Sequence, residues 1–251
     1  MHRVARLLLL LPILAAAQAQ SARTQKHLVL QSAEDRRDEY NVILRKVFKR
    51  IYDEDVVLSV LCVPSFVPEE AAGILKTSKG YEAFAVTPSA STWSTEYHRF
   101  IKEVDAHGKE IPFNPARNTK TGLPTSYRGI KTRLQSRPLS ANLAERIKQL
   151  WQAKLLEALH PPPEPKDSER VIVLDGVSYY YAMPLQGHGL VTAEGKLVDQ
   201  NTTVWLMGEF SEVLSGYAKG KASEGELKKA LKCVESQRAN QTSEVVLNNS
   251  E

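Results

Sequence analysis

A serine-containing loop lies just ahead of a histidine and an aspartate, and these are the residue types of a catalytic triad. Ser91 and Ser94 precede His98 and Asp105. A serine becomes a nucleophile when a histidine takes its proton and a carboxylate orients that histidine. Triads are defined by geometry, however, and the chain has no Gly-x-Ser-x-Gly elbow. We therefore favour a polar loop that leads into a helix cap.

The other groups that could do chemistry are scattered along the chain. His188 lies between Gly187 and Gly189, where an exposed imidazole could act as a general acid or base, although a histidine in a turn is usually only solvated. The histidines and cysteines form no His-Glu-x-x-His motif and no cluster, so we expect no metal site. A glycine-rich phosphate loop is also missing, and we expect no cofactor.

Uncompensated positive charge is the strongest local feature of the sequence. Residues 114–137 contain six basic residues and no acidic one. The prolines and glycines of residues 111–137 predict a long loop, and loops of this length are commonly functional or disordered. The charge offers a surface for an anionic partner, such as peptidoglycan, an acidic polysaccharide, lipid headgroups or an acidic protein, and the alternative is a solvated loop. The candidate ligand-binding residues are Arg117, Lys120, Tyr127, Arg128, Lys131, Arg133 and Arg137.

The N-terminus has the layout of a cleavable secretory signal peptide. Arg3 and Arg6 precede the apolar run Leu7–Ala17, and Ala17-Gln18-Ala19 is a small-x-small cleavage site. The run is too short for a membrane span, and no later run approaches the required length. We therefore predict an exported protein, periplasmic or extracellular, with residues 1–19 removed. Export makes nucleic acid a poor partner, and loss of Arg3 and Arg6 lowers the net charge from +4 to +2.

The chain contains two cysteines, Cys62 and Cys233. In an oxidising compartment an isolated pair is a candidate disulfide. Cys62 falls in an apolar strand-like run, and Cys233 lies near the edge of a helical stripe. Each could instead be a quiet buried thiol, because spacing alone does not bring two Cα atoms within bonding range.

Hydrophobic periodicity predicts an α+β fold, an antiparallel sheet with covering helices. Helical spacing favours amphipathic helices from Ser32, from Tyr97, from Ser140, from Phe210 and from Ser223, although a strand is the alternative over Arg99–Val104. A short helix is also expected after Pro68, because proline suits the first helical position and Glu69-Glu70 suit the positive end of the helix dipole. β-Branched runs predict strands at 56–63, 81–87 and 202–207. The Pro-rich run His160–Pro165 is a candidate boundary between a region 20–160 and a region 166–236, although one domain is favoured slightly. A flexible tail is expected over 237–251.

The stretch from Val171 to Met183 is predicted to be a β-hairpin that turns at Asp175-Gly176. Asp-Gly suits a type I′ turn, and the flanking residues are β-branched or aromatic. Tyr179 and Tyr181 should then share one face, with Tyr180 on the other. The simpler interpretation makes these tyrosines part of the core, and the alternative is a tyrosine-lined binding surface.

Together these patterns favour an exported, non-catalytic binding protein over an enzyme. The binding hypothesis rests on the charged segment 114–137 and on the missing catalytic motif. The alternative is an exported hydrolase of cell-envelope or extracellular material, with Ser91 or Ser94, His98, Asp105 or His188 in its site. Such an enzyme requires those side chains to converge.

Overall fold

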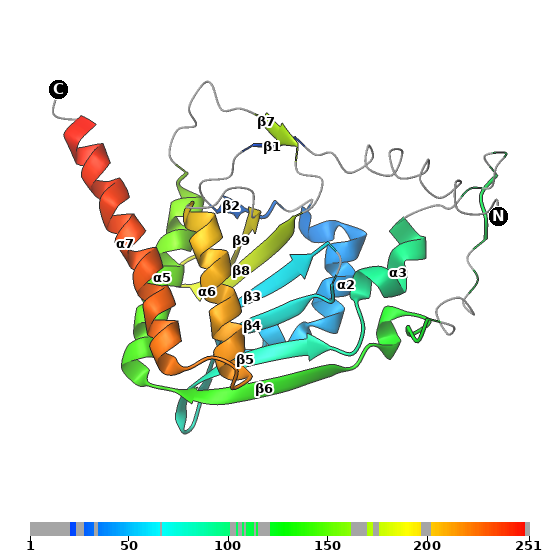
Figure 1. Cartoon of the computed structure of the whole chain (residues 1–251), viewed down its shortest axis with the longest axis horizontal. Coiled ribbons are helices and arrows are strands. Elements are labelled where there is room, and N and C mark those ends of the chain that lie inside the picture. The colour runs from blue at the N-terminus through cyan, green and yellow to red at the C-terminus, as the bar shows by residue number, and fades with distance from the viewer. Residues whose placement is uncertain are drawn as a thin grey trace, which may run out of the picture.

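A seven-stranded antiparallel sheet forms the centre of the protein in the computed structural model (Figure 1). Its strand order is β2-β9-β8-β3-β4-β5-β6, and β1 pairs separately with β7. The predicted fold class, α+β with an antiparallel sheet and covering helices, is confirmed. The structure describes residues 21–23, 28–32, 35–65, 67–100, 104, 107, 109–112, 114, 121–161, 170–172, 176–196 and 202–248.

The elements follow one another along the chain with helices between groups of strands. The strands are β1 (Ser21–Arg23), β2 (Val29–Leu30), β3 (Val56–Pro64), β4 (Glu70–Thr77), β5 (Gly80–Pro88), β6 (Thr132–Leu139), β7 (Arg170–Ile172), β8 (Val177–Leu185) and β9 (Gly189–Lys196). The α-helices are α2 (Glu39–Val47), α3 (Thr92–Phe100), α5 (Ala141–Leu159), α6 (Thr203–Ala218) and α7 (Glu224–Asn248). Short 3-10 turns are η1 (Asp35–Arg37), η2 (Lys49–Tyr52) and η3 (Tyr127–Gly129).

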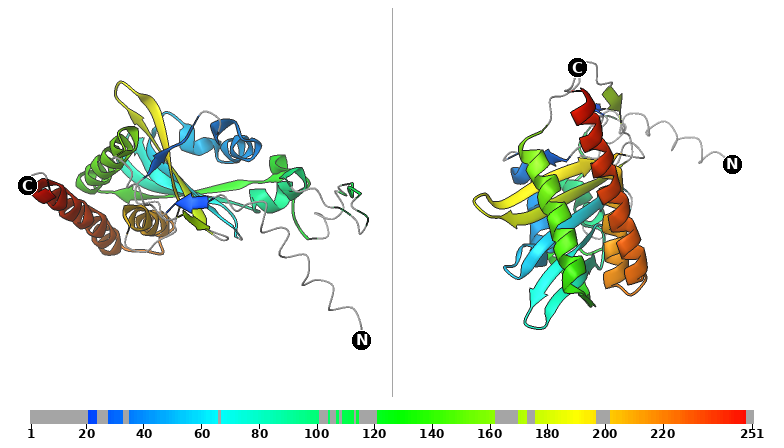
Figure 2. Two further views of the ribbon diagram at one scale, coloured as in Figure 1. Left: turned by 90° about the horizontal axis from the view of Figure 1, so that it is seen from above. Right: turned by 90° about the vertical axis from the view of Figure 1, so that its left-hand side faces the viewer.

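Strand β3 is the middle strand of the sheet and is covered on both faces, as its nearly continuous apolar sequence predicts. Leu58 and Val60 face one core cluster, and Leu61 faces the other. Helices α5, α6 and α7 cover the first face, and α2 with η2 covers the second (Figure 2). The helices therefore lie on both sides of one sheet.

The tyrosines of β8 alternate as predicted. Tyr179 and Tyr181 are fully buried on the face covered by α5, α6 and α7, and Tyr180 packs against the opposite cluster. The Trp151 ring lies edge-on to Tyr181 at 5.5 Å and to Phe210 at 5.7 Å. These contacts join α5, the sheet and α6, so Tyr179 and Tyr181 belong to the core and do not form an exposed surface.

The predicted hairpin at Asp175-Gly176 is wrong. Strand β7 pairs with β1, and β8 pairs with β3 on one side and β9 on the other. The hairpin partner of β8 is β9, and the chain reverses at Gln186–His188, where Gly187 has φ +81°. Glu194-Gly195, whose glycine suggests a turn in the sequence, lies inside β9. Asp175 itself lies outside the described residues, and local turn chemistry did not reveal the long-range partner of β8.

Two further predicted elements have the opposite secondary structure. The segment after Pro68 is strand β4 and not a helix, because it lies between β3 and β5 with Ala71 and Ala72 buried on opposite faces. Residues 202–207 begin helix α6 and not a strand. The Thr202 hydroxyl caps that helix by accepting from Trp205 N at 3.1 Å. In both segments tertiary packing determines the secondary structure and overrides the local propensity.

The helix starts also differ from the sequence pattern in places. Helix α2 begins after Asp38 and not at Ser32, where the helix was predicted to start. The Asp38 carboxylate caps it by accepting from Tyr40 N at 3.1 Å. Helix α3 begins at Thr92, ahead of the predicted start at Tyr97. Helix α5 follows Ser140 as predicted.

The helix predicted from Ser223 is present as α7, and it begins with a capping box. Ser223 N donates to the Glu226 carboxylate at 2.7 Å, and Glu226 N donates to Ser223 Oγ at 3.2 Å. The backbone of α7 extends to Asn248. The division into regions, the flexible tail over 237–251 and the signal peptide remain predictions, and residues 1–19 lie outside the described ranges. Among the described helices none is both long and apolar enough to cross a membrane.

Gly73 of β4 permits a close approach that a side chain would block. A Cβ built there would collide with the Leu58 carbonyl oxygen and lie 2.7 Å from the Phe84 ring. We expect Gly73→Ala to lower the free energy of unfolding by about 3 kcal/mol, because the core must shift to accept the methyl group. The matched control is Gly216→Ala in α6, where the nearest atom would lie 3.4 Å away. Its stability should change by less than about 1 kcal/mol in the same urea titration. Equal destabilisation of both variants would contradict this packing.

Candidate functional site

The predicted basic segment lies at one edge of the sheet. Tyr127 and Arg128 belong to η3, Lys131 precedes β6, and Arg133 and Arg137 lie on β6 (Figure 1). The long loop predicted for residues 111–137 is thus wrong from Thr132 onward, because that stretch is the edge strand. Arg117 and Lys120 lie outside the described residues. We call Tyr127, Arg128, Lys131 and Arg133 the basic edge.

Tyr127 is held between two cations and a buried carboxylate. Its backbone N–H donates to Glu96 of α3. Lys46 Nζ lies 5.6 Å from the centre of its ring, and the Arg128 guanidinium lies 5.9 Å away. Arg128 and then Lys46 lower the pKa of the Tyr127 phenol. Lys46 comes from α2, on the basic side of that amphipathic helix, and sequence patterns did not place it beside Tyr127.

The charges of the basic edge have no acidic partner among the described residues. Arg128, Lys131 and Arg133 are exposed, and none of them forms an ion pair there. Arg50 shows the contrast, because its guanidinium is paired with Asp55 at 2.5 Å and with Asp53 at 2.9 Å. The backbone of Lys131 is fixed, since its carbonyl accepts from Ser89 N at 2.7 Å. The edge therefore presents free positive charge on a defined backbone.

Arg137 has a different environment from the other basic residues. Its guanidinium stacks over the Tyr217 ring at 4.5 Å and donates to the Ala222 carbonyl at 3.1 Å. Tyr217 OH in turn donates to the Pro138 carbonyl at 2.7 Å. These contacts bind the loop between α6 and α7 to one end of β6. Arg137 therefore has a structural role.

The structure describes the Ser/His/Asp candidates only in part. Ser91 Oγ accepts from Ser94 N at 3.1 Å and so caps the start of α3. His188 lies in the β8–β9 turn, at the opposite end of the sheet from Ser91, since Val177 of β8 pairs with Pro64 at the near end. The His98 side chain and Asp105 lie outside the described residues. Ser91 is therefore engaged as a helix cap, whereas Ser94 lies four residues ahead of His98 on α3.

A polar cleft between α6 and the sheet was missed by sequence reasoning. Tyr179, Cys62 and Glu70 lie directly opposite one another on β8, β3 and β4. Above them, Glu212 accepts from Tyr179 OH at 2.9 Å, and Glu70 binds both Ser215 and Lys219 of α6. The cleft has a volume of about 330 Å³, and apart from these groups and Ser211 its lining is apolar. Strand pairing creates it from residues far apart in sequence, so no local pattern could have revealed it.

The chemistry of the polar cleft is limited by burial. Burial raises the pKa of the Cys62 thiol to about 12, so the thiolate that a nucleophile requires is scarce at neutral pH. Burial likewise raises the pKa of the Tyr179 phenol above its usual value. The polar groups of the cleft bond mainly to one another, and this favours a structural role. Both Cys62 and Cys233 are free in this structure, Cys62 half-buried and Cys233 exposed on α7.

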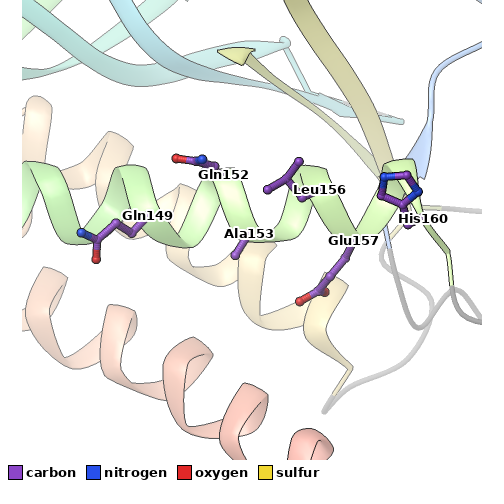
Figure 3. A pocket seen from close by; sticks show the side chains of 6 residues that line it. All are labelled: Gln149, Gln152, Ala153, Leu156, Glu157 and His160. Carbon is purple, nitrogen blue, oxygen red and sulfur yellow. The ribbon is translucent and has the colours of Figure 1, made fainter. Parts of the chain in front are cut away.

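A larger but shallower groove runs along α5. It measures about 610 Å³ and is lined by Gln149, Gln152, Ala153, Leu156, Glu157 and His160. Figure 3 shows Gln149 and Glu157 directed toward α7, whereas Gln152 and Leu156 lie on the other side of α5. The Glu157 carboxylate is already bound by the buried Lys154 ammonium at 2.8 Å. In the described ranges no group of three or more His, Cys, Asp or Glu residues could hold a metal ion.

The two thiols should differ strongly in reactivity. At pH 8 a pKa of about 12 leaves about one Cys62 side chain in ten thousand as thiolate. We expect iodoacetamide to alkylate Cys233 rapidly and Cys62 slowly, with the Cys62 rate rising about tenfold per pH unit because its folded pKa lies far above the assay pH. Peptide mass spectrometry measures both rates, and unfolding in guanidinium should make them equal. Rapid labelling of folded Cys62, or protection of both cysteines without reductant, would contradict the structure.

Comparison of the chain with models of protein families, with curated protein sequences and with solved structures gave no match.

Proposed function

We propose that the protein is an exported, non-catalytic binding protein that recognises an anionic partner through residues 114–137. The observation that carries the proposal is the basic edge, where Arg128, Lys131 and Arg133 are exposed without an acidic partner among the described residues. Unpaired cations on a protein surface raise the local concentration of anions and speed their binding. The partner therefore meets positive charge that no described carboxylate neutralises.

Rigidity of the basic edge supports binding further. Ser89 holds Lys131 through two hydrogen bonds, and Glu96 holds the backbone of Tyr127. A binding surface whose backbone is already ordered loses less conformational entropy when its partner binds. The Tyr127 ring adds an aromatic contact beside Lys46 and Arg128. Aromatic and arginine side chains are the residue types enriched at interfaces.

Export supports the choice among anionic partners. The signal-peptide pattern of residues 1–19 directs the chain to a compartment where acidic glycans, lipid headgroups and acidic proteins occur, and nucleic acid fits that compartment poorly. Because the arginine guanidinium is planar and binds carboxylates and phosphates through two parallel bonds, Arg128 and Arg133 suit any of these anionic groups.

The proposal predicts that neutralising the basic edge weakens binding to anions. We expect the triple variant R128Q/K131Q/R133Q to elute from a heparin column at lower salt than the wild type. The loss should be about 2 kcal/mol, or roughly thirtyfold in affinity, because each exposed charge contact contributes up to about 1 kcal/mol. Affinity at several salt concentrations, measured by fluorescence anisotropy, checks this value.

A matched control removes the same charge elsewhere. The variant K79Q/K229Q/K232Q neutralises three exposed lysines outside the basic edge, on the β4–β5 turn and on α7. It should bind heparin as the wild type does. If both variants lose affinity equally, net charge alone governs binding and the proposed surface is wrong.

A further inference from the structure

Strand β6 leaves one edge of the sheet open. It is the last strand in the sheet order, and within the described part of the chain β5 is the strand that pairs with it (Figure 1). The pairing runs without a register shift from Pro88↔Thr132 to Tyr81↔Leu139. An edge strand exposes a row of backbone donors and acceptors that another extended segment can pair with.

The backbone groups that point outward can be assigned from two observations. Pro138 lies opposite Glu82 and has no N–H, so this pair cannot be a hydrogen-bonded pair. At the other end, Ser89 N donates to the Lys131 carbonyl, which shows that odd-numbered residues bond toward β5. Hydrogen-bonded and non-hydrogen-bonded pairs alternate in an antiparallel ladder. The N–H and C=O groups of Thr132, Leu134 and Ser136 therefore point away from the sheet.

These outward groups are accessible. Thr132, Leu134 and Ser136 are exposed, and Leu134 retains 46% of its accessible surface. The far end of the strand is occupied, because Tyr217 OH binds the Pro138 carbonyl. The open stretch thus runs from Thr132 to Ser136. It is long enough for a strand of average length to pair with it.

Side chains on the two faces of β6 indicate what the added strand would carry. Arg133 lies on the face that α6 covers, opposite Thr87, and Lys131 continues the same side. Leu134 lies on the other face, opposite Val86 of the second core cluster. A complementary strand would place carboxylates beside Arg133 and Lys131 and an apolar side chain beside Leu134, since cross-strand neighbours interact directly.

We propose that β6 receives an extended acidic segment of a partner protein as an additional strand, paired with the backbone of Thr132, Leu134 and Ser136. The inference rests on the proposed function and names the partner as a peptide segment in which acidic and apolar residues alternate. A second copy of this chain fits the edge less well. Pairing of two β6 strands would place Arg133 and Lys131 of one copy near the like charges of the other. Backbone pairing supplies affinity, and the basic edge supplies selection for acidic sequence.

The test uses the full mature chain and a labelled peptide in which Glu and Val alternate. Ser136→Pro removes one outward N–H and leaves the inward ladder intact, because Ser136 does not bond toward β5. Ser136→Ala is its matched control and keeps the N–H. By fluorescence anisotropy we expect Ser136→Pro to weaken binding about tenfold or more, and Ser136→Ala to change it less than about twofold. The thermal midpoint of Ser136→Pro, compared with the wild type, checks that the variant folds.

A second arm changes the peptide, so that it does not depend on any variant folding. N-methylation of alternate peptide residues blocks one edge of its strand, and the two alternating patterns block opposite edges. Strand addition predicts that one pattern abolishes binding and the other preserves it. If neither pattern matters and Ser136→Pro binds normally, or if the wild type does not bind the peptide, strand addition is overturned. Loss of heparin binding in R128Q/K131Q/R133Q would still support the proposed function in that case.

Discussion

The pairing of β3 with β8 is the constraint on which the rest of the structure depends. It joins the early strands β3, β4 and β5 to the late strands β8 and β9. The paired residues of β3 and β8 are more than a hundred positions apart in the sequence. Because β3 is buried on both faces, each face must be covered, and helices from both ends of the chain provide that cover. The Trp151 ring then fixes α5 and α6 over Tyr181.

This arrangement also decides where binding can occur. Because helices cover the centre of both faces, the backbone groups without a strand partner among the described strands lie at the two edges, and β2 at one edge is two residues long. Strand β6, at the other edge, is longer and contains Arg133, with Lys131 directly before it, and neither side chain has an acidic partner in the described ranges. Interior positions, such as the polar cleft beneath α6, contain charged groups that bind one another. The edge is thus the place where backbone and charge are both available to a partner.

Sequence patterns predicted the elements whose burial is simple. The doubly buried run of β3, the long helix after Ser140 and the capping box of Ser223 all follow from local rules. Patterns failed where the partner strand decides the conformation. β4 has helix-like apolar spacing but is extended because β3 and β5 bond to both of its edges. Asp175-Gly176 has the chemistry of a hairpin turn, yet β7 bonds to β1.

The candidate site was predictable in composition but not in geometry. The run of basic residues without acids is visible in the sequence, whereas the edge position of Arg133 and the stacking of Arg137 on the Tyr217 ring require the fold. Lys46 joins Tyr127 only through the packing of α2.

Hydrogen–deuterium exchange of the whole mature protein, with and without the alternating acidic peptide, tests the location of binding most directly. The account predicts slower exchange in the segment that contains η3 and β6, and unchanged exchange in α6 and in the β8–β9 hairpin. Protection confined to the cleft beneath α6 or to the groove on α5 would contradict it.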